Sequence, residues 1–187
     1  MASRMMIRNA PSLLAILLLS SSLSVRAQES VTPAPALEFL GFRAGASLGD
    51  VSTALTRVRG GALKCQGAKV DKRVSECRAD FTDPAAGRPL ELWLSAVDSM
   101  SSVLMLSGTV SGDQLILWRR TLERAYGQVD ANVHGPQWMM QWVRQGRMIR
   151  LTWRLESGRK LASVSLIDGH VLDAWGEHRG ARRPTRR

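Results

Sequence analysis

The sequence has little that points to a particular chemistry. Among its 187 residues there are two cysteines, three histidines and one tyrosine. No segment approaches the run of about 18 uncharged apolar residues that a bilayer span requires. No phosphate-binding loop and no dinucleotide-type glycine pattern occurs either. The sequence therefore identifies no substrate and no reaction.

The charge of the chain does not indicate a nucleic-acid-binding domain. The net charge is +10, of which residues 1–27 hold +3 and the last twelve residues hold +4, so that the 148 residues between them hold only +3. A nucleic-acid-binding domain would place a basic stripe on its folded body. The hydrophobic content of 44% is that of a globular protein, and we expect no specific nucleic-acid binding.

Residues 1–27 have the pattern of a secretory signal peptide. Arg4 and Arg8 precede the apolar run 13–19, and Ala27 occupies the −1 position of a cleavage site. We expect cleavage near Ala27 and a periplasmic or secreted mature protein without a transmembrane segment. The alternative is a retained N-terminal anchor, although the apolar run is short for that role. No cysteine follows this run, so lipid anchoring is not expected.

Two more segments flank an expected domain at residues 37–175. Residues 28–36 contain two prolines and few apolar residues, which is typical of a linker. Residues 176–187 are rich in arginine, and their composition predicts disorder. This tail either contacts anionic lipid headgroups or polyanions weakly, or serves only as a solubilising end.

Cys65 and Cys77 are the only cysteines, and an exported chain with two cysteines most simply forms one disulfide. A turn near residues 70–72 would place them opposite each other on a hairpin of strands 63–70 and 73–81. Redox pairs usually have Cys-x-x-Cys spacing, and no histidine lies near enough in sequence to suggest zinc. We predict a structural disulfide.

The remaining patterns predict two helices and further strands. Ser47 is a candidate N-cap for a short helix that ends at Gly60-Gly61, and Ser111 begins a second helix that ends at Gly127. Alternation of apolar and polar residues predicts strands outside the cysteine hairpin. These strands are expected at residues 90–97, 103–110, 137–144, 147–155 and 160–168. A loop is expected around 132–136.

The last three strands also predict their register. Turns at 145–146 and 156–159 place Trp138 opposite Trp153 and Trp142 opposite Ile149. One face is then continuously apolar, with these tryptophans in the core, and the other is polar. The polar face holds Gln137, Gln141, Arg150, Thr152, Arg154, Ser163 and Ser165. A slip of one residue would invert both faces.

These elements predict an α+β fold in which two helices pack on one face of an antiparallel sheet. Their order suggests two tandem helix-plus-meander units, near 45–110 and 111–168. The segment Gly45-Ala46-Ser47-Leu48-Gly49-Asp50-Val51, a short helix, a glycine stop and a meander resemble modules of the beta-lactamase-inhibitory-protein-like fold, as in small outer-membrane assembly lipoproteins. The resemblance implies a protein-binding scaffold. The lipoprotein cysteine is absent here.

Few residues suggest catalysis or metal binding. The histidines have no spacing that suits a shared metal ion: His134, His170 and His178. Asp168 and Asp173 near His170 form the only close carboxylate–imidazole grouping, although a turn at Asp168-Gly169 explains the local sequence as well. Asp80 and Glu91 are candidates for a pair across two strands, and solvated charges explain them equally. We expect no catalytic, cofactor or metal-binding residues.

Two predicted surfaces suit a partner. Arg150 and Arg154 lie on the same face of one predicted strand, beside Gln137 and Gln141 on the next strand. Their guanidinium groups suit carboxylates or carbonyls of a partner. Trp93 points away from the leucines of its own strand and marks an apolar patch. The alternatives are an outer face that is merely solvated and a patch covered by a loop.

These observations favour an exported, non-enzymatic binding or interaction module of the cell envelope. The sequence does not identify its partner, for which an envelope protein is the candidate. The alternative is a small periplasmic hydrolase or other enzyme whose site is assembled from loops. A binding module predicts an exposed mixed face without a titratable cluster. An enzyme predicts a concave pocket that brings His134 or His170 to a carboxylate.

Overall fold

The computed structural model describes residues 36–181, with side chains through residue 177, all within one compact unit at 35–187. The predicted signal peptide at 1–27, all but the last residue of the 28–36 linker and the final six residues of the tail lie outside the described residues. The signal peptide and the cleavage near Ala27 therefore stay predictions.

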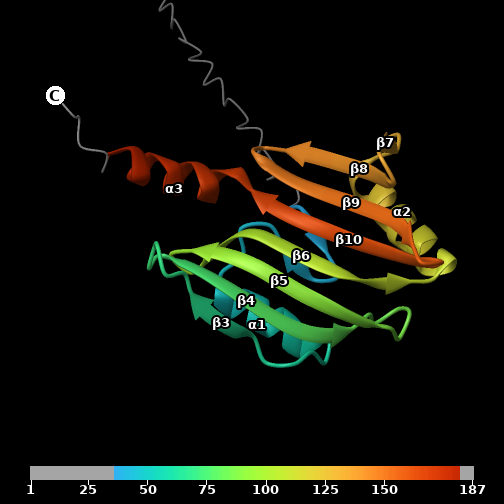
Figure 1. Ribbon diagram of the computed structural model, residues 1–187, viewed down its shortest axis with the longest axis horizontal. Helices are drawn as coiled ribbons and strands as arrows, with labels where there is room; N and C mark the ends of the chain where they lie inside the picture. Colours follow the sequence, from blue (N-terminus) through green and yellow to red (C-terminus); the bar gives the residue numbers. More distant parts are fainter. Residues whose placement is uncertain (1–35, 182–187) are drawn as a thin grey trace, which may run out of the picture. The chain divides into compact units, whose positions relative to one another are not determined.

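The described residues form three helices, an eight-stranded antiparallel sheet and a two-stranded hairpin (Figure 1), which confirms the α+β class. The elements are β1 (Glu38–Phe39), β2 (Phe42–Arg43), α1 (Leu48–Arg57), β3 (Lys64–Gly67), β4 (Val74–Thr82), β5 (Pro89–Val97), β6 (Met100–Val110), α2 (Gly112–Tyr126), β7 (Asn132–His134), β8 (Gln137–Arg144), β9 (Arg147–Glu156), β10 (Arg159–Asp168) and α3 (Gly169–Ala181). The strand order in the large sheet is β3-β4-β5-β6-β10-β9-β8-β7.

A helix followed by four consecutive strands occurs twice in this order. The last strands of the two meanders, β6 and β10, pair with each other at the centre of the sheet, where Leu106 lies opposite Val164. The second meander contains one strand more than the sequence predicted. Residues 132–134, expected as a loop, form β7, because Gly135 adopts a φ of 59° and lets the chain return at once into β8.

Both predicted helices begin at their predicted caps. The Ser47 Oγ accepts a hydrogen bond from the Asp50 backbone N at 3.1 Å, and the Ser111 Oγ accepts one from the Gln114 N at 3.1 Å. Such bonds satisfy backbone N–H groups that the first turn of a helix leaves unpaired. The helix positions found from the sequence are therefore confirmed.

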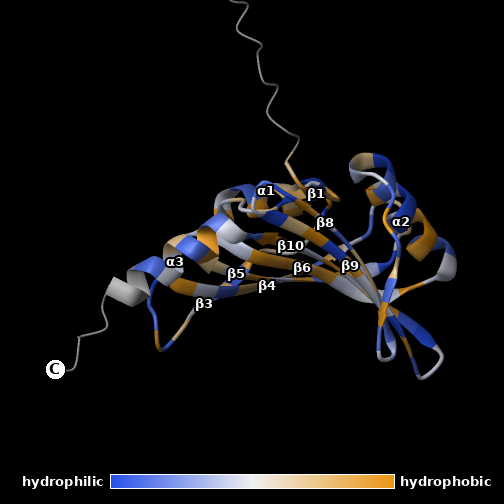
Figure 2. Ribbon diagram, turned by 90° about the horizontal axis from the view of Figure 1, so that it is seen from above, coloured by the Kyte–Doolittle hydropathy of each residue, from blue (hydrophilic) through white to orange (hydrophobic). Residues whose placement is uncertain are grey.

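The register of the last three strands is confirmed as well. Trp138 lies opposite Trp153, and Trp142 lies opposite Ile149. Along most of β4, β5 and β10, every second side chain is buried, and apolar and polar residues alternate in the same way (Figure 2). The buried strand residues and the buried residues of α1 and α2 form one hydrophobic core. We call the alternate, exposed or half-buried positions of the large sheet its open face.

One tryptophan was placed wrongly by the pattern. Trp138 shares the face of the core residues but is 39% exposed, whereas Trp142 is 4% exposed. Trp138 stacks on Trp153 with an interplanar angle of 6°, and Arg119 of α2 lies over the other ring. Trp138 lies on β8, next to the short edge strand β7. On that side its partner in the sheet is Val133 of β7. The alternation of apolar and polar residues shows on which face of the sheet a side chain lies. It does not show how far that face is covered by other elements.

The predicted disulfide between Cys65 and Cys77 is confirmed. The two residues lie directly opposite each other on β3 and β4, with their Cα atoms 4.0 Å apart. The bond fastens the short edge strand β3 to the body of the sheet. In the chain-entropy model, a loop of this length stabilises the fold by about 3 kcal/mol.

The segment after β10 differs from the prediction. Asp168 does not form a simple turn but begins α3, since its Oδ1 accepts hydrogen bonds from the backbone N of His170 at 3.0 Å and of Val171 at 3.3 Å. The helix continues to residue 181, so residues 176–181 of the predicted tail are helical. The sequence pattern did not predict this helix, because α3 has no apolar stripe of its own. Polar contacts stabilise it instead.

Asp168 also explains the first glycine of the 45–51 motif. The carboxylate is 1% exposed and accepts a hydrogen bond from the Arg147 Nε at 2.6 Å. A Cβ atom on Gly45 would overlap the Asp168 Oδ2, and Gly45 has a φ of 73°. Only glycine fits both constraints without displacing the carboxylate.

Candidate binding surface

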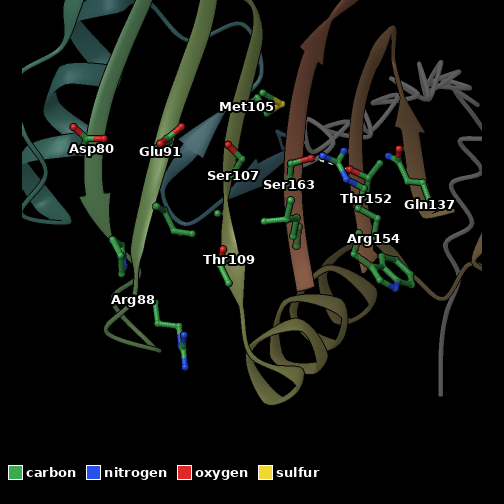
Figure 3. A pocket seen from close by; sticks show the side chains of 16 residues that line it. Asp80, Arg88, Glu91, Met105, Ser107, Thr109, Gln137, Thr152, Arg154 and Ser163 are labelled. Atoms are coloured by element: carbon green, nitrogen blue, oxygen red, sulfur yellow. Dashed lines mark hydrogen bonds between the residues drawn. The ribbon is translucent and has the colours of Figure 1, made fainter. Parts of the chain in front are cut away.

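The open face of the sheet is hollowed into a groove of about 710 Å³ that extends from β4 to β8. Polar side chains from six strands point into it (Figure 3). Its lining includes Asp80, Glu91, Ser107, Thr109, Ser163, Thr152, Arg154 and Gln137. Pockets of this volume are typical of sites that enclose part of a ligand, and here the polar side chains stand among apolar ones such as Met105 and Leu161.

The side chains of this groove form rows because the register of the sheet is continuous. In one row, Glu91 of β5 faces Ser107 of β6, which faces Ser163 of β10, which faces Thr152 of β9. The Thr152 and Ser163 hydroxyl oxygens are 2.7 Å apart and share a hydrogen bond. Hydroxyl groups both donate and accept, so this row can hydrogen-bond with the N–H and C=O groups of an incoming chain.

The predicted binding residues on the last strands lie together in pairs. Gln141 faces Arg150, and its Oε1 accepts a hydrogen bond from the Arg150 Nη2 at 3.3 Å. The Arg150 Nε is buried and has no hydrogen-bond partner within residues 36–181. Gln137 faces Arg154, which donates two hydrogen bonds to Glu156, at 3.0 and 2.8 Å.

Trp93 does not join these arginines. It lies on β5, opposite Met105 of β6, with β10 between β6 and the strand of Arg150. Its side chain is half-buried and points to the open face, as predicted. Met105 also lines the groove, so Trp93 and Met105 form an apolar area that extends from its margin.

Asp80 and Glu91 lie directly opposite each other on β4 and β5. The sequence left two interpretations of these residues equally open: a pair across the two strands, or two solvated charges. Both side chains are exposed and line the groove, and neither takes part in the ion pairs found between residues 36 and 181.

The carboxylate–imidazole grouping suggested by the sequence is not assembled. The His170 ring Nε2 is 2.9 Å from the Gln145 carbonyl oxygen, and the free oxygen of Asp168 accepts from Arg147 instead. His134 is exposed on β7 and does not line the groove. In the described part of the chain, no group of three or more His, Cys, Asp or Glu side chains is arranged to hold a metal ion.

Residues 45–49 have the Gly-x-Ser-x-Gly spacing of hydrolase nucleophile turns. The structure gives Ser47 another role. Its backbone has φ −66° and ψ 158°, an ordinary extended conformation rather than a strained turn. Its Oγ caps α1 and donates to the Asp50 Oδ2 at 2.9 Å. Ser47 therefore serves the helix start in this structure.

Sequence reasoning missed the groove residues on β6. Ser107 and Thr109 are polar positions that alternate with the buried Leu104, Leu106 and Val110. That alternation was visible in the sequence and would have placed them on the open face. The sequence did not show that β6 pairs with β10, which brings them beside Ser163 and Leu161.

The two shifted ionisable groups lie outside the groove. Hydrogen bonding from the Trp175 indole, and then from Arg73, lowers the pKa of Asp71 from 3.8 to about 2. Burial raises the pKa of Tyr126, whose hydroxyl bonds to the backbone N and O of Glu38. Both contacts attach peripheral segments to the sheet, α3 in the first case and β1 in the second.

Comparison with known proteins gives no further information about this surface. No family model matches the chain, and no curated protein and no solved structure was found to be similar to it. Within residues 36–181, no helix is long and apolar enough to cross a membrane.

Proposed function

We propose that this chain is an exported, non-enzymatic binding module of the cell envelope, which presents the open face of its sheet to an envelope protein. The observation that carries the proposal is the row of exposed and half-buried polar side chains across six strands, hollowed into a groove. Side chains on a hydrogen-bonded sheet are held in place before a partner arrives, which reduces the entropy cost of binding.

The proposal includes the packing of α1 and α2 on the same face of the sheet, which leaves the opposite face for a partner. In support, Leu55 of α1 and Trp118 of α2 belong to the core that contains the buried strand residues. The proposal also includes the likeness to the beta-lactamase-inhibitory-protein-like fold. The element order, a helix and a four-stranded meander occurring twice, supports that part.

Export is the remaining part of the proposal. The Cys65–Cys77 disulfide supports it, since such bonds persist in oxidising compartments. The enzyme alternative requires a histidine beside a carboxylate in a pocket. The groove has acidic residues but no histidine in its lining. His170 and Asp168 line a smaller pocket of about 310 Å³, where the His170 Nε2 is 2.9 Å from the Gln145 carbonyl oxygen and the Asp168 Oδ2 accepts from Arg147. An open polar face therefore favours binding over catalysis.

Affinity capture from an envelope extract tests the proposal, with mature protein from residue 28 as bait. The variant R150S/R154S removes both arginines of β9. Loss of the exposed Arg154 side chain should lower the free energy of unfolding by no more than about 0.5 kcal/mol. Arg150 is half-buried and donates a hydrogen bond to Gln141, so its loss should cost about 1 kcal/mol. Capture of the envelope partner should decrease. Full capture by a well-folded variant would remove this face from consideration, and a large loss of stability would show that the arginines support the fold.

A further inference from the structure

We propose that the groove receives a protruding polypeptide segment of the partner, which directs a lysine or arginine at Asp80 and Glu91 and a carboxylate at Arg154. This inference rests on the proposed function, because it specifies the chemistry of the partner at the same face. It follows from the distribution of charge across the sheet, from the row of hydroxyls between the charges and from the spacing of the strands.

The acidic end of the groove carries uncompensated charge. Asp80 and Glu91 face each other across β4 and β5, and like charges in that position destabilise a sheet. Arg78 lies diagonal to Glu91, and Arg88 lines the groove, yet neither forms an ion pair with these carboxylates. A cationic side chain from a partner would relieve the repulsion and gain from both carboxylates.

The opposite end of the groove is basic. Arg154 bonds only to Glu156, and both side chains are about half exposed, at 49% and 54%. Exposed ion pairs of this kind contribute little to stability, so Arg154 can exchange Glu156 for a partner's carboxylate. Arg150, four residues earlier on β9, adds a second positive charge with no carboxylate partner in the described chain. The face is therefore negative over β4–β5 and positive over β9.

The floor between the two ends suits a polypeptide backbone. Ser107, Ser163 and Thr152 offer hydroxyls in one row across β6, β10 and β9. Hydroxyls can pair with backbone N–H and C=O groups of any sequence, so they favour an extended segment without selecting its side chains.

The spacing of the strands sets the pattern of the segment. β5 and β9 are three strand spacings apart, or about 14 Å. An extended chain rises about 3.4 Å per residue and directs residues i, i+2 and i+4 to the same side. Arg154 lies two residues along β9 from Thr152, the β9 residue in the row of Glu91, so Glu91 and Arg154 are about 16 Å apart diagonally. A basic residue at i and an acidic residue at i+4 are about 14 Å apart, and their side chains cover the remaining distance to Glu91 and Arg154. Small residues between them fit over the hydroxyl row.

A defined peptide tests this pattern directly. The probe is the acetylated and amidated pentapeptide Lys-Ser-Gly-Ser-Asp, titrated into isotope-labelled mature protein while amide resonances are followed by NMR. The matched probe replaces its lysine by glutamine. We expect the lysine peptide to shift the resonances of Ser107 and Ser163 and to bind at least fivefold more tightly than the glutamine peptide.

Three single variants then assign the charge preference. D80N and E91Q should each weaken binding of the lysine peptide about fivefold or more, and their melting temperatures should stay level or rise, because a repulsion is removed. E76Q, on β4 but outside the groove lining, is the matched control and should change the affinity less than twofold. Raising the ionic strength should weaken the binding of the lysine peptide to wild-type protein by screening.

Several results would overturn the inference. Equal binding of the lysine and glutamine peptides, or unchanged binding by D80N and E91Q, would show that the face does not select a cation, while the proposed function would stand. No shift on the open face would reject a peptide occupant, and the capture experiment with R150S/R154S would still decide the proposed function. Dimerisation of the free protein through this face would identify a second copy as the occupant.

Discussion

The two faces of the large sheet consist of the same strands but have opposite composition. On β6, Leu104 and Leu106 are fully buried, whereas Met105 between them and Ser107 after them are half-buried and point to the open face. The core side gains its stability from burial of apolar surface. The open side has oriented polar groups, including an unrelieved pair of carboxylates, and contributes less to folding. The difference teaches that one strand can carry the stability of the fold and its binding residues at alternate positions.

The largest expected effect separates the two faces on a single strand. L104A removes a fully buried side chain at the centre of the sheet and should lower the free energy of unfolding by about 2–5 kcal/mol. M105A, its neighbour on the open face, should cost about 1 kcal/mol or less, since its side chain is only partly buried. Chemical denaturation of both variants measures the difference. Similar losses would mean that the open face is covered in the native protein.

Two aspartates provide the second comparison. Asp83 is fully buried in the β4–β5 loop, and its Oδ2 accepts hydrogen bonds from the Gln114 Nε2 at 2.7 Å and the Trp118 Nε1 at 2.9 Å. D83N presents an amide to these donors and should cost about 2–4 kcal/mol. D80N, three residues away on the open face, should be neutral or slightly stabilising. Thermal unfolding distinguishes them, and a destabilising D80N would show that Asp80 has a structural partner.

The smallest expected effect concerns α3. This helix covers neither face of the sheet and is attached at one end of it. The Trp175 indole donates to Asp71 at 3.0 Å, and the pKa of Asp71 is lowered from 3.8 to about 2. The carboxylate is therefore charged and bonded above its ordinary pKa, and its contribution is lost as the pH falls towards 2. The indole N–H resonance of Trp175 should titrate with a midpoint near pH 2. A midpoint near 3.8 would contradict the contact, and D71N should abolish the titration.

Local sequence patterns predicted most of the elements and the register of three strands. Alternation located β8, β9 and β10, and caps located α1 and α2, because these signals depend on neighbouring residues. The pairing of Cys65 with Cys77 followed from cysteine count and a turn. The same reasoning missed β7 and α3, since a three-residue strand is too short to show a period and α3 depends on Asp168 and on a distant contact with Asp71.

The binding surface was only half visible in the sequence. The arginines and glutamines of β8 and β9 were found, because a clear register placed them on one face. The groove also needs β4, β5 and β6, and these join the arginines only through the pairing of β6 with β10. That contact links residues more than 50 positions apart, and no local pattern reports it. For Asp80 and Glu91, the sequence left a cross-strand pair and solvated charges equally open, and it did not place them as one wall of this groove.

Site-specific photo-crosslinking tests the central claim that the open face meets the partner. A photoreactive residue replaces Thr109, exposed on the open face, or Thr53, exposed on α1, and the protein is irradiated in an envelope extract. Both positions are exposed threonines, so each reactive group is equally accessible to a partner. The account predicts a discrete crosslinked product from position 109 and none from position 53. Crosslinking from position 53 alone, or equally from both, would contradict it.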